Sequence, residues 1–200
     1  MTILPAAYLP SVAYVAHLLR DECVIDVGEH YVKRSQRNRA RILTAHGPMD
    51  LTVHLRDANR PQTPVRDVRI DYSKRWQHQH WLALVSAYGA SPYFAYFAPY
   101  LERFYTQRFD GLADYDLGLL GVLLDLAAVD RRPRISESYV EARPGDLDLR
   151  PKHAKDPAFV AESYVQVFSD RMDFVPNLSF ADLLFAEGRQ SVSVLRRCLR

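Results

Sequence analysis

Five cationic side chains crowd residues 31–41, a segment that contains no acidic residue: Lys33, Arg34, Arg37, Arg39 and Arg41. The chain as a whole carries 26 Lys and Arg against 24 Asp and Glu, a formal net charge of +2, so this positive field is local. Together with Ser35 and Asn38, these groups supply many hydrogen-bond donors and few acceptors, which suits a phosphate or a carboxylate. The segment therefore predicts an anion-binding site.

An alternative interpretation of the same segment is a solvated strand edge, where Lys and Arg discourage pairing with another chain. The spacing favours binding, because Arg37, Arg39 and Arg41 share one face of an extended strand while Asn38 points to the other. We expect Lys33, Arg37 and Arg39 to hold the anion and Asn38 to fix its orientation.

The second group of interest is Trp76-Gln-His-Gln-His-Trp81. On a helix, side chains two residues apart diverge by about 200°, so His78 and His80 cannot share a metal ion, and we predict no metal site. Trp76, His80 and Leu84 follow one helical stripe, which places His80 at the border of the core, where its charged and neutral forms can be balanced for proton transfer. The alternative is a core-border histidine with one satisfied hydrogen bond.

Asp182 is the candidate partner of His80 in catalysis. It lies three residues after Ser179, the spacing of a capping box, and helix capping alone would explain both residues. A catalytic Asp182 requires a histidine, for which His80 is the candidate. Aromatic residues from Tyr88 to Tyr105 either fill the core or line a cleft and stack on a ligand. We predict Trp76 and Tyr88 as substrate-binding residues.

The predicted elements begin with a helix over residues 10–19, a buried strand over 23–27 and a hairpin turning near Gly47-Pro48. A polar loop over 59–64 and a strand over 65–71 follow. Helices are expected from Ser73 to Gly89, over 91–107, 114–128, 176–188 and 191–199. Residues 131–157 should cover the surface with one short strand near Ile135. Strands first and helices after predict a single α+β domain over residues 1–200.

Composition and missing motifs exclude several classes. The hydrophobic fraction of 48% is ample for a core. With eight glycines and no G-x-S-x-G, H-E-x-x-H or glycine-rich nucleotide fingerprint, we expect no bound cofactor. The modest charge argues against nucleic-acid binding. Cys23 and Cys198 are expected as free thiols. Neither a signal peptide nor a membrane-spanning run is recognisable, so we expect a soluble, cytoplasmic protein.

In their order along the chain, several stretches resemble the WbqC-like family of bacterial proteins. They are Tyr8-Leu-Pro10, Tyr31, Lys33, Arg37-Asn-Arg39, Gly47-Pro48, Leu51-Thr-Val53, Trp76, His80-Trp81, Ala87-Tyr88, Ser91-Pro-Tyr-Phe94, Pro176-Asn-Leu-Ser179, Asp182-Leu-Leu-Phe185 and Glu187-Gly188. The resemblance implies a role in O-antigen or other surface-polysaccharide, or in lipid, biosynthesis, and it supplies no catalytic residue or cofactor. Leu82 stands where a basic residue often follows His-Trp in that family.

Two functions follow from these observations. The first is a transferase of glycosyl, acyl or aminoacyl type that acts on an anionic activated substrate, such as a nucleotide sugar or an activated acyl donor. The second is a non-catalytic binding or assembly protein of the same pathway. A deep pocket shared by Arg37, Arg39, His80 and Tyr88 would favour the enzyme, and a flat basic face would favour docking.

Overall fold

A small parallel sheet forms the base of the fold. The computed structural model describes residues 1–56 and 62–200. Its sheet has the order β5-β2-β1-β6 and contains β1 (Thr2–Pro5), β2 (Cys23–Asp26), β5 (Arg134–Ser136) and β6 (Leu147–Asp148). All three strand pairs are parallel. The predicted strands near 23–27 and Ile135 are confirmed, whereas β1 and β6, of four and two residues, were not predicted.

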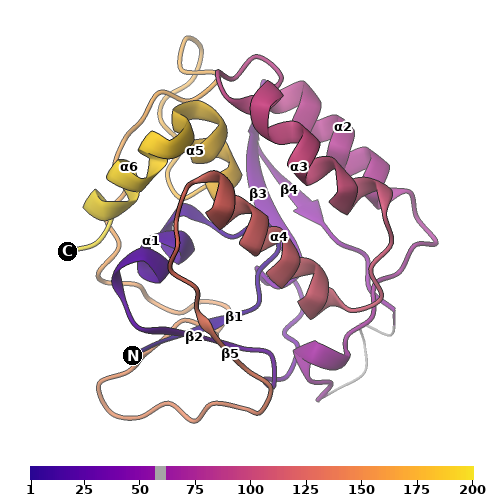
Figure 1. The fold of residues 1–200 in the computed structure, drawn as a ribbon, viewed down its shortest axis with the longest axis vertical. Coiled ribbons are helices and arrows are strands. Elements are labelled where there is room, and N and C mark those ends of the chain that lie inside the picture. Colours follow the sequence, from indigo (N-terminus) through magenta and orange to yellow (C-terminus); the bar gives the residue numbers. More distant parts are fainter. Residues whose placement is uncertain (57–61) are drawn as a thin grey trace.

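Helix α1 (Val12–Arg20) connects β1 to β2, which makes these elements one β-α-β unit. Ser11 caps the helix by accepting a hydrogen bond from the backbone N–H of Tyr14 at 3.4 Å. The helix predicted over residues 10–19 is thereby confirmed. The Tyr14 hydroxyl donates to the Pro5 carbonyl at 2.8 Å, so the carboxyl end of β1 and the first turn of α1 lie together. Figure 1 shows the two elements in sequence at the amino end of the chain.

The predicted hairpin forms from β3 (Arg39–Thr44) and β4 (Gly47–Thr52), which pair antiparallel. Gly47 has a φ of 105°, a conformation that L-residues with side chains rarely adopt, so glycine ends the turn. Along β3, Ala40 and Ile42 are buried while Arg39 and Arg41 lie on the other face. Arg37 precedes the strand in a turn, so the expectation that it shares this face is wrong.

The strand predicted over residues 65–71 is also wrong. Residues Val65–Asp67 form a 3-10 turn, η1, and Ile70 makes an isolated bridge to Leu55. Carbonyl groups of the segment after β2 accept hydrogen bonds from the backbone here. The N–H of Val65 donates to the Glu29 carbonyl at 2.9 Å, and the N–H of Arg66 donates to the Val27 carbonyl at 2.9 Å. Of the loop predicted over 59–64, residues 59–61 lie outside the described part of the chain.

The helices follow the predicted order. They are α2 (Trp76–Tyr88), α3 (Phe94–Thr106), α4 (Leu112–Leu126), α5 (Phe180–Glu187), the 3-10 turn η2 (Gly188–Gln190) and α6 (Ser191–Arg197). Figure 1 shows α2 and α3 side by side, α5 and α6 as a second pair, and α4 between the two pairs. Ser73 does not cap α2, which starts after Arg75; instead the Ser73 hydroxyl bonds to the Asp71 carboxylate at 2.8 Å.

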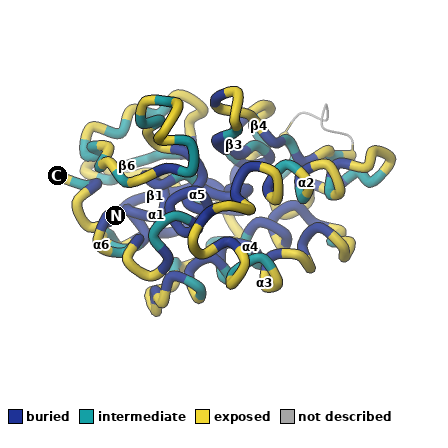
Figure 2. The backbone as a smooth tube through the Cα atoms, turned by 90° about the horizontal axis from the view of Figure 1, so that it is seen from above, coloured by how far each residue is buried: buried dark blue, intermediate teal, exposed yellow. Residues whose placement is uncertain are grey.

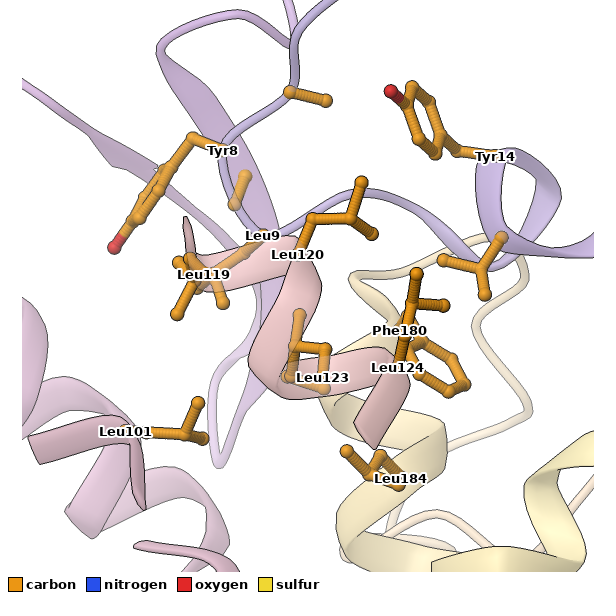
Figure 3. Packing of buried hydrophobic residues seen from close by; sticks show 14 of the residues in the cluster. Tyr8, Leu9, Tyr14, Leu101, Leu119, Leu120, Leu123, Leu124, Phe180 and Leu184 are labelled. Carbon is orange, nitrogen blue, oxygen red and sulfur yellow. The ribbon is translucent and has the colours of Figure 1, made fainter. Parts of the chain in front are cut away.

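Helix α4 is the centre of the core. Five of its leucines are buried, and four of these, Leu119, Leu120, Leu123 and Leu124, pack between the segment after β1 and helix α5 (Figure 3). Leu9 contributes from the first side, and Phe180 and Leu184 from the second. Figure 2 shows buried backbone gathered through the middle of the molecule and exposed stretches along its outer helices and loops. Strands early and helices late give the predicted α+β class.

Candidate functional site

A two-lobed cleft opens beyond the carboxyl ends of β1 and β6, and we call it the basic cleft. Its wide lobe has a volume of about 450 Å³ and its narrow lobe about 250 Å³. Six residues line both lobes: Ser11, Ser35, Gln36, Arg41, Lys152 and Asn177. In open α/β sheets, ligands bind outside the carboxyl ends of the strands, so this position is one where a ligand site is expected.

The narrow lobe is strongly cationic. Arg34, Arg39, Arg41 and Lys152 line it together with a single carboxylate, Asp50, which accepts from Arg41 Nε at 2.9 Å. Within the part of the chain that the structure describes, no carboxylate lies within ion-pair distance of the other three cations. The Nε atom of Arg39 is buried and has no hydrogen-bond partner among these residues. A buried donor without an acceptor costs about 1–3 kcal/mol.

Backbone strain gathers in the same lobe. Leu9, Arg34 and Asn177 have φ values of 41°, 54° and 53°, and all three line the narrow lobe. A residue with a side chain in this left-handed region costs about 1–3 kcal/mol, and such residues cluster at functional sites. Strain at three segments far apart in sequence, meeting at one cavity, supports the choice of this cavity as the functional site.

The two cations that line only the wide lobe, Arg37 and Arg150, are paired with carboxylates of the protein. Arg37 is buried and donates to both carboxylate oxygens of Glu29, through Nε at 2.9 Å and Nη2 at 2.5 Å. Its Nη1 donates to Ser35 Oγ at 3.0 Å and its Nη2 to the carbonyl of Arg150 at 3.0 Å. Burial raises the pKa of Glu29 to about 6, against the opposing effect of Arg37.

Arg150 is similarly engaged beside the ends of β2 and β6. Its Nη1 donates to Asp26 Oδ2 at 2.5 Å, and its Nε and Nη2 donate to the two oxygens of Asp148 at 2.9 and 2.8 Å. Tyr139 covers the guanidinium at 4.5 Å from the ring centroid. Arg37 and Arg150, the two arginines that line only the wide lobe, therefore hold the segments beyond the strand ends together, and most of their donors are engaged within the protein.

The other predicted members of the basic segment lie outside the cleft. Asn38 extends the hairpin, because its Nδ2 donates to the carbonyl of Val53 at 3.0 Å. Lys33 is exposed and lines neither lobe. Of the predicted substrate-binding residues, the structure thus brings Arg39 to the narrow lobe and Arg37 to the wall of the wide lobe.

His80 is buried behind the cleft. Its Nδ1 lies 2.9 Å from the hydroxyl of Tyr8, a residue that also lines the narrow lobe. Burial lowers the pKa of His80 to about 4, so the imidazole is neutral near pH 7; a hydrogen bond with the Thr52 backbone opposes this shift. A neutral ring that bonds the Thr52 backbone through Nε2–H leaves Nδ1 to accept from Tyr8. The Tyr8 hydroxyl is also 3.2 Å from that of Tyr105.

Asp182 belongs to a separate cluster. Its Oδ2 accepts from the Tyr164 hydroxyl at 2.6 Å and from Gln166 Nε2 at 3.3 Å. Burial raises the pKa of this carboxyl, and the Tyr164 hydrogen bond opposes the shift. Among the residues that the structure describes, no hydrogen bond joins Asp182 to His80, so the expected pairing of these two side chains is not observed.

Trp76 and Tyr88 are core residues. Trp76 is fully buried, donates from its indole nitrogen to the Asp71 carbonyl at 2.9 Å and packs edge-on against His80. The Tyr88 hydroxyl accepts from the Leu43 backbone at 3.0 Å. Neither residue lines the basic cleft.

Sequence reasoning assigned no role to several residues of the cleft, among them Gln36, Lys152 and Asn177. Asn177 Oδ1 accepts from the Ala13 backbone at 3.0 Å, which leaves its Nδ2 as a donor at the junction of the lobes. Two signals could have marked Asn177: Asn tolerates left-handed backbone, and the residue stands in the stretch Pro176-Asn-Leu-Ser179 that resembles the family. Lys152 had none, because a lone lysine in a proline-broken segment usually faces solvent.

The described residues contain no cluster of three or more His, Cys, Asp or Glu side chains suited to a metal ion. Cys23 and Cys198 are both free and buried, and burial raises the pKa of the Cys23 thiol to about 12. In the described chain, no helix combines the length and apolar character required to cross a bilayer.

Comparison with known proteins matches residues 6–155 of the chain to the model of the WbqC-like protein family. The chain belongs to the WbqC-like protein family. It is also 27% identical over 219 residues to "Uncharacterized protein Rv1507c" of Mycobacterium tuberculosis, an alignment that covers 96% of this chain and 92% of the relative. No solved structure matches the chain.

The family match includes most of the basic cleft of this WbqC-like chain, from Tyr8 to Lys152. Asn177 and Ser179 of the narrow lobe lie beyond it. Leu82, where the resemblance led us to expect a basic residue, is exposed on α2 and lines neither lobe.

Proposed function

We propose that this WbqC-like protein binds an anionic, activated small molecule in the basic cleft and transfers a group from it. The supporting observation is the set of three cations in the narrow lobe, Arg34, Arg39 and Lys152, which have no carboxylate partner among the described residues. Guanidinium and ammonium groups with free donors bind phosphate and carboxylate groups strongly, and more so where water is partly excluded.

Roles follow from position. Arg39, Arg34 and Lys152 hold the anion, and Asn177 Nδ2 orients it at the junction of the lobes. Arg37 supports the site through Glu29 instead of contacting the ligand. We assign His80 as a positioning residue that holds Tyr8 next to the strained Leu9. We assign Asp182 likewise, because it lies in the first turn of α5, whose cap Ser179 lines the narrow lobe.

The pathway in this proposal is surface-polysaccharide or lipid biosynthesis, and it rests on the family resemblance alone. A transferase of glycosyl, acyl or aminoacyl type fits a cleft with one cationic lobe and one lobe of mixed character. The wide lobe, at about 450 Å³, falls within the range of small-molecule sites.

A thermal-shift screen with nucleotide sugars, acyl thioesters and aminoacyl-adenylate analogues tests binding, because a ligand of the native state raises the melting temperature. The expected hit is lost in Arg39→Gln and Lys152→Gln and kept in Arg196→Gln, an exposed arginine on α6. Turnover of that hit is then followed by product analysis. A screen in which no anionic donor shifts the wild type, or in which Arg196→Gln behaves like the cleft variants, contradicts the proposal.

The alternative is a non-catalytic binding or assembly protein, and one observation favours it. The three serine hydroxyls of the cleft are engaged locally: Ser11 and Ser179 cap helices, and Ser35 donates to the Val32 carbonyl at 2.6 Å. In the described part of the cleft, no serine is paired with a histidine as an activated nucleophile would be. Binding that depends on Arg39 and Lys152 but is never followed by turnover would establish this alternative.

A further inference from the structure

The narrow lobe carries more positive charge than a single monoanion neutralises. Four cations line a volume of about 250 Å³, and Asp50 offsets one of them through Arg41. Three positive charges therefore face one small space. Like charges held this close repel one another, and the repulsion is relieved most by a ligand that carries two or three negative charges.

The free donors of this lobe come from three separate segments of the chain. Arg39 lies on β3, Arg34 in the turn before it, and Lys152 in the loop after β6. Asn177, held by its hydrogen bond to the Ala13 backbone, adds an uncharged donor. A planar carboxylate accepts two parallel hydrogen bonds along one edge, whereas phosphoryl oxygens point in tetrahedral directions and can satisfy donors on several sides.

The charged residues that line only the wide lobe are instead paired with other side chains of the protein. Arg37 is paired with Glu29, and Arg150 with Asp26 and Asp148. The remaining carboxylate of this lobe, Asp156, accepts from His17 Nε2 at 2.9 Å. The two lobes therefore differ in charge. The narrow lobe suits a negatively charged group, and the wide lobe suits an uncharged polar or apolar group.

We propose that the narrow lobe is a diphosphate subsite, and that the wide lobe takes the uncharged moiety attached to that diphosphate. This inference rests on the proposed function and narrows it: the activated substrate is a diphosphate ester. The shared chemistry is a pyrophosphate linkage, as it occurs in a nucleoside diphosphate donor and in coenzyme A thioesters.

Isothermal titration calorimetry with inorganic pyrophosphate, inorganic phosphate and acetate at one fixed, low salt concentration tests the charge argument. Wild type is expected to bind pyrophosphate at least about tenfold more tightly than phosphate, and acetate more weakly still. Arg39→Gln and Lys152→Gln are each expected to weaken pyrophosphate binding about tenfold, the loss typical of one charge-assisted hydrogen bond. The matched control Arg196→Gln should bind like wild type.

Two further arms, uridine diphosphate and coenzyme A, identify the source of the diphosphate, and tighter binding of either one than of pyrophosphate supports the wide-lobe assignment. Binding of pyrophosphate without any gain for either compound overturns that assignment. Equal affinity for phosphate and pyrophosphate, or a loss in Arg196→Gln equal to that in the cleft variants, overturns the diphosphate subsite. If the binding of acetate or phosphate is still weakened by Arg39→Gln and Lys152→Gln, the proposed function stands without the diphosphate subsite. If wild type binds none of these anions, both the proposed function and the diphosphate subsite are contradicted. Lys152 is exposed, so Lys152→Gln tests the subsite even if Arg39→Gln unfolds.

Discussion

His80 Nδ1 lies 2.9 Å from the hydroxyl oxygen of Tyr8, although the two residues are 72 positions apart in the chain. The contact joins helix α2 to the segment that follows β1 and enters the wall of the narrow lobe. It replaces the expected partnership of His80 with Asp182. The consequences of this and the other buried polar groups can be measured.

The first prediction concerns the pH dependence that His80 gives to stability. Unfolded His80 takes up a proton below about pH 6.5, but the folded protein resists until about pH 4, because burial lowers its pKa. Its contribution is therefore present above pH 6.5 and is lost as pH falls toward 4, amounting to about 3 kcal/mol. Urea unfolding at several pH values measures the free energy of unfolding of wild type and of His80→Gln. The difference between these two free energies should become smaller as the pH is lowered. A constant difference would contradict the neutral, buried imidazole.

Asp116 provides the second prediction. Both of its carboxylate oxygens are buried without hydrogen-bond partners among the described residues, and burial raises its pKa well above the ordinary value. Unfolded Asp116 ionises near pH 4 while the folded group keeps its proton, so its contribution to stability is lost as pH rises from there to the folded pKa. Asp116→Asn should stabilise the protein at pH 7 by about 1–3 kcal/mol. The exposed Asp130→Asn is the control, and a lower melting temperature for Asp116→Asn would reject the prediction.

The third prediction separates a structural role of Arg37 from a ligand-binding one. Arg37→Met leaves Glu29 buried without its partner and should destabilise the fold by about 3–5 kcal/mol. Replacing both residues in Arg37→Met/Glu29→Met should recover much of this loss, since no buried charge is left unpaired. Chemical denaturation measures both variants. A double variant as unstable as the single one would show that the pair itself stabilises the fold.

The fourth prediction isolates the strain at Arg34. Because φ is 54° there, Arg34→Gly relieves a conformation that costs an alanine about 1–2 kcal/mol. Allowing for the greater freedom of unfolded glycine, Arg34→Gly should be about 0.5–1 kcal/mol more stable than Arg34→Ala. Both variants should lose anion binding, because both lose the guanidinium. Equal melting temperatures for the two would mean that the backbone at this position is unstrained in solution.

The fifth prediction concerns the Asp182 cluster. Tyr164→Phe removes the donor that lies 2.6 Å from Asp182 Oδ2, and it should cost about 1–3 kcal/mol because the carboxyl is buried. Anion affinity should change less than in Arg39→Gln, since Tyr164 lines neither lobe. Tyr96→Phe, at an exposed tyrosine of α3, is the matched control for loss of a hydroxyl. A Tyr164→Phe variant with full stability and no ligand binding would instead place Asp182 in the site.

Local sequence signals located most of the elements. Ser179 caps the helix it was expected to cap, and apolar spacing placed α2 to α6 within a few residues. The first helix was expected to begin at Pro10, whereas Ser11 caps it and Val12 begins it. Sequence patterns typical of strands were less reliable, because a strand forms only where another segment pairs with it. Val65 to Asp71 has strand-like alternation, yet its backbone bonds to loops because no neighbouring strand is available. Strand β1 is buried in the sheet, but its four residues carry too little pattern to be recognised.

By itself, the sequence determined the charge: a cationic, acid-free segment on an α+β chain of the WbqC-like family. Only the tertiary structure decided which cations are free. Arg37 and Arg39 are the same residue type two positions apart, but Arg37 faces Glu29 in the interior while Arg39 faces the cleft. Lys152 and Asn177 join Arg39 from more than 100 residues away. Charge is a property of a residue, whereas its neutralisation depends on long-range contacts that no local pattern encodes.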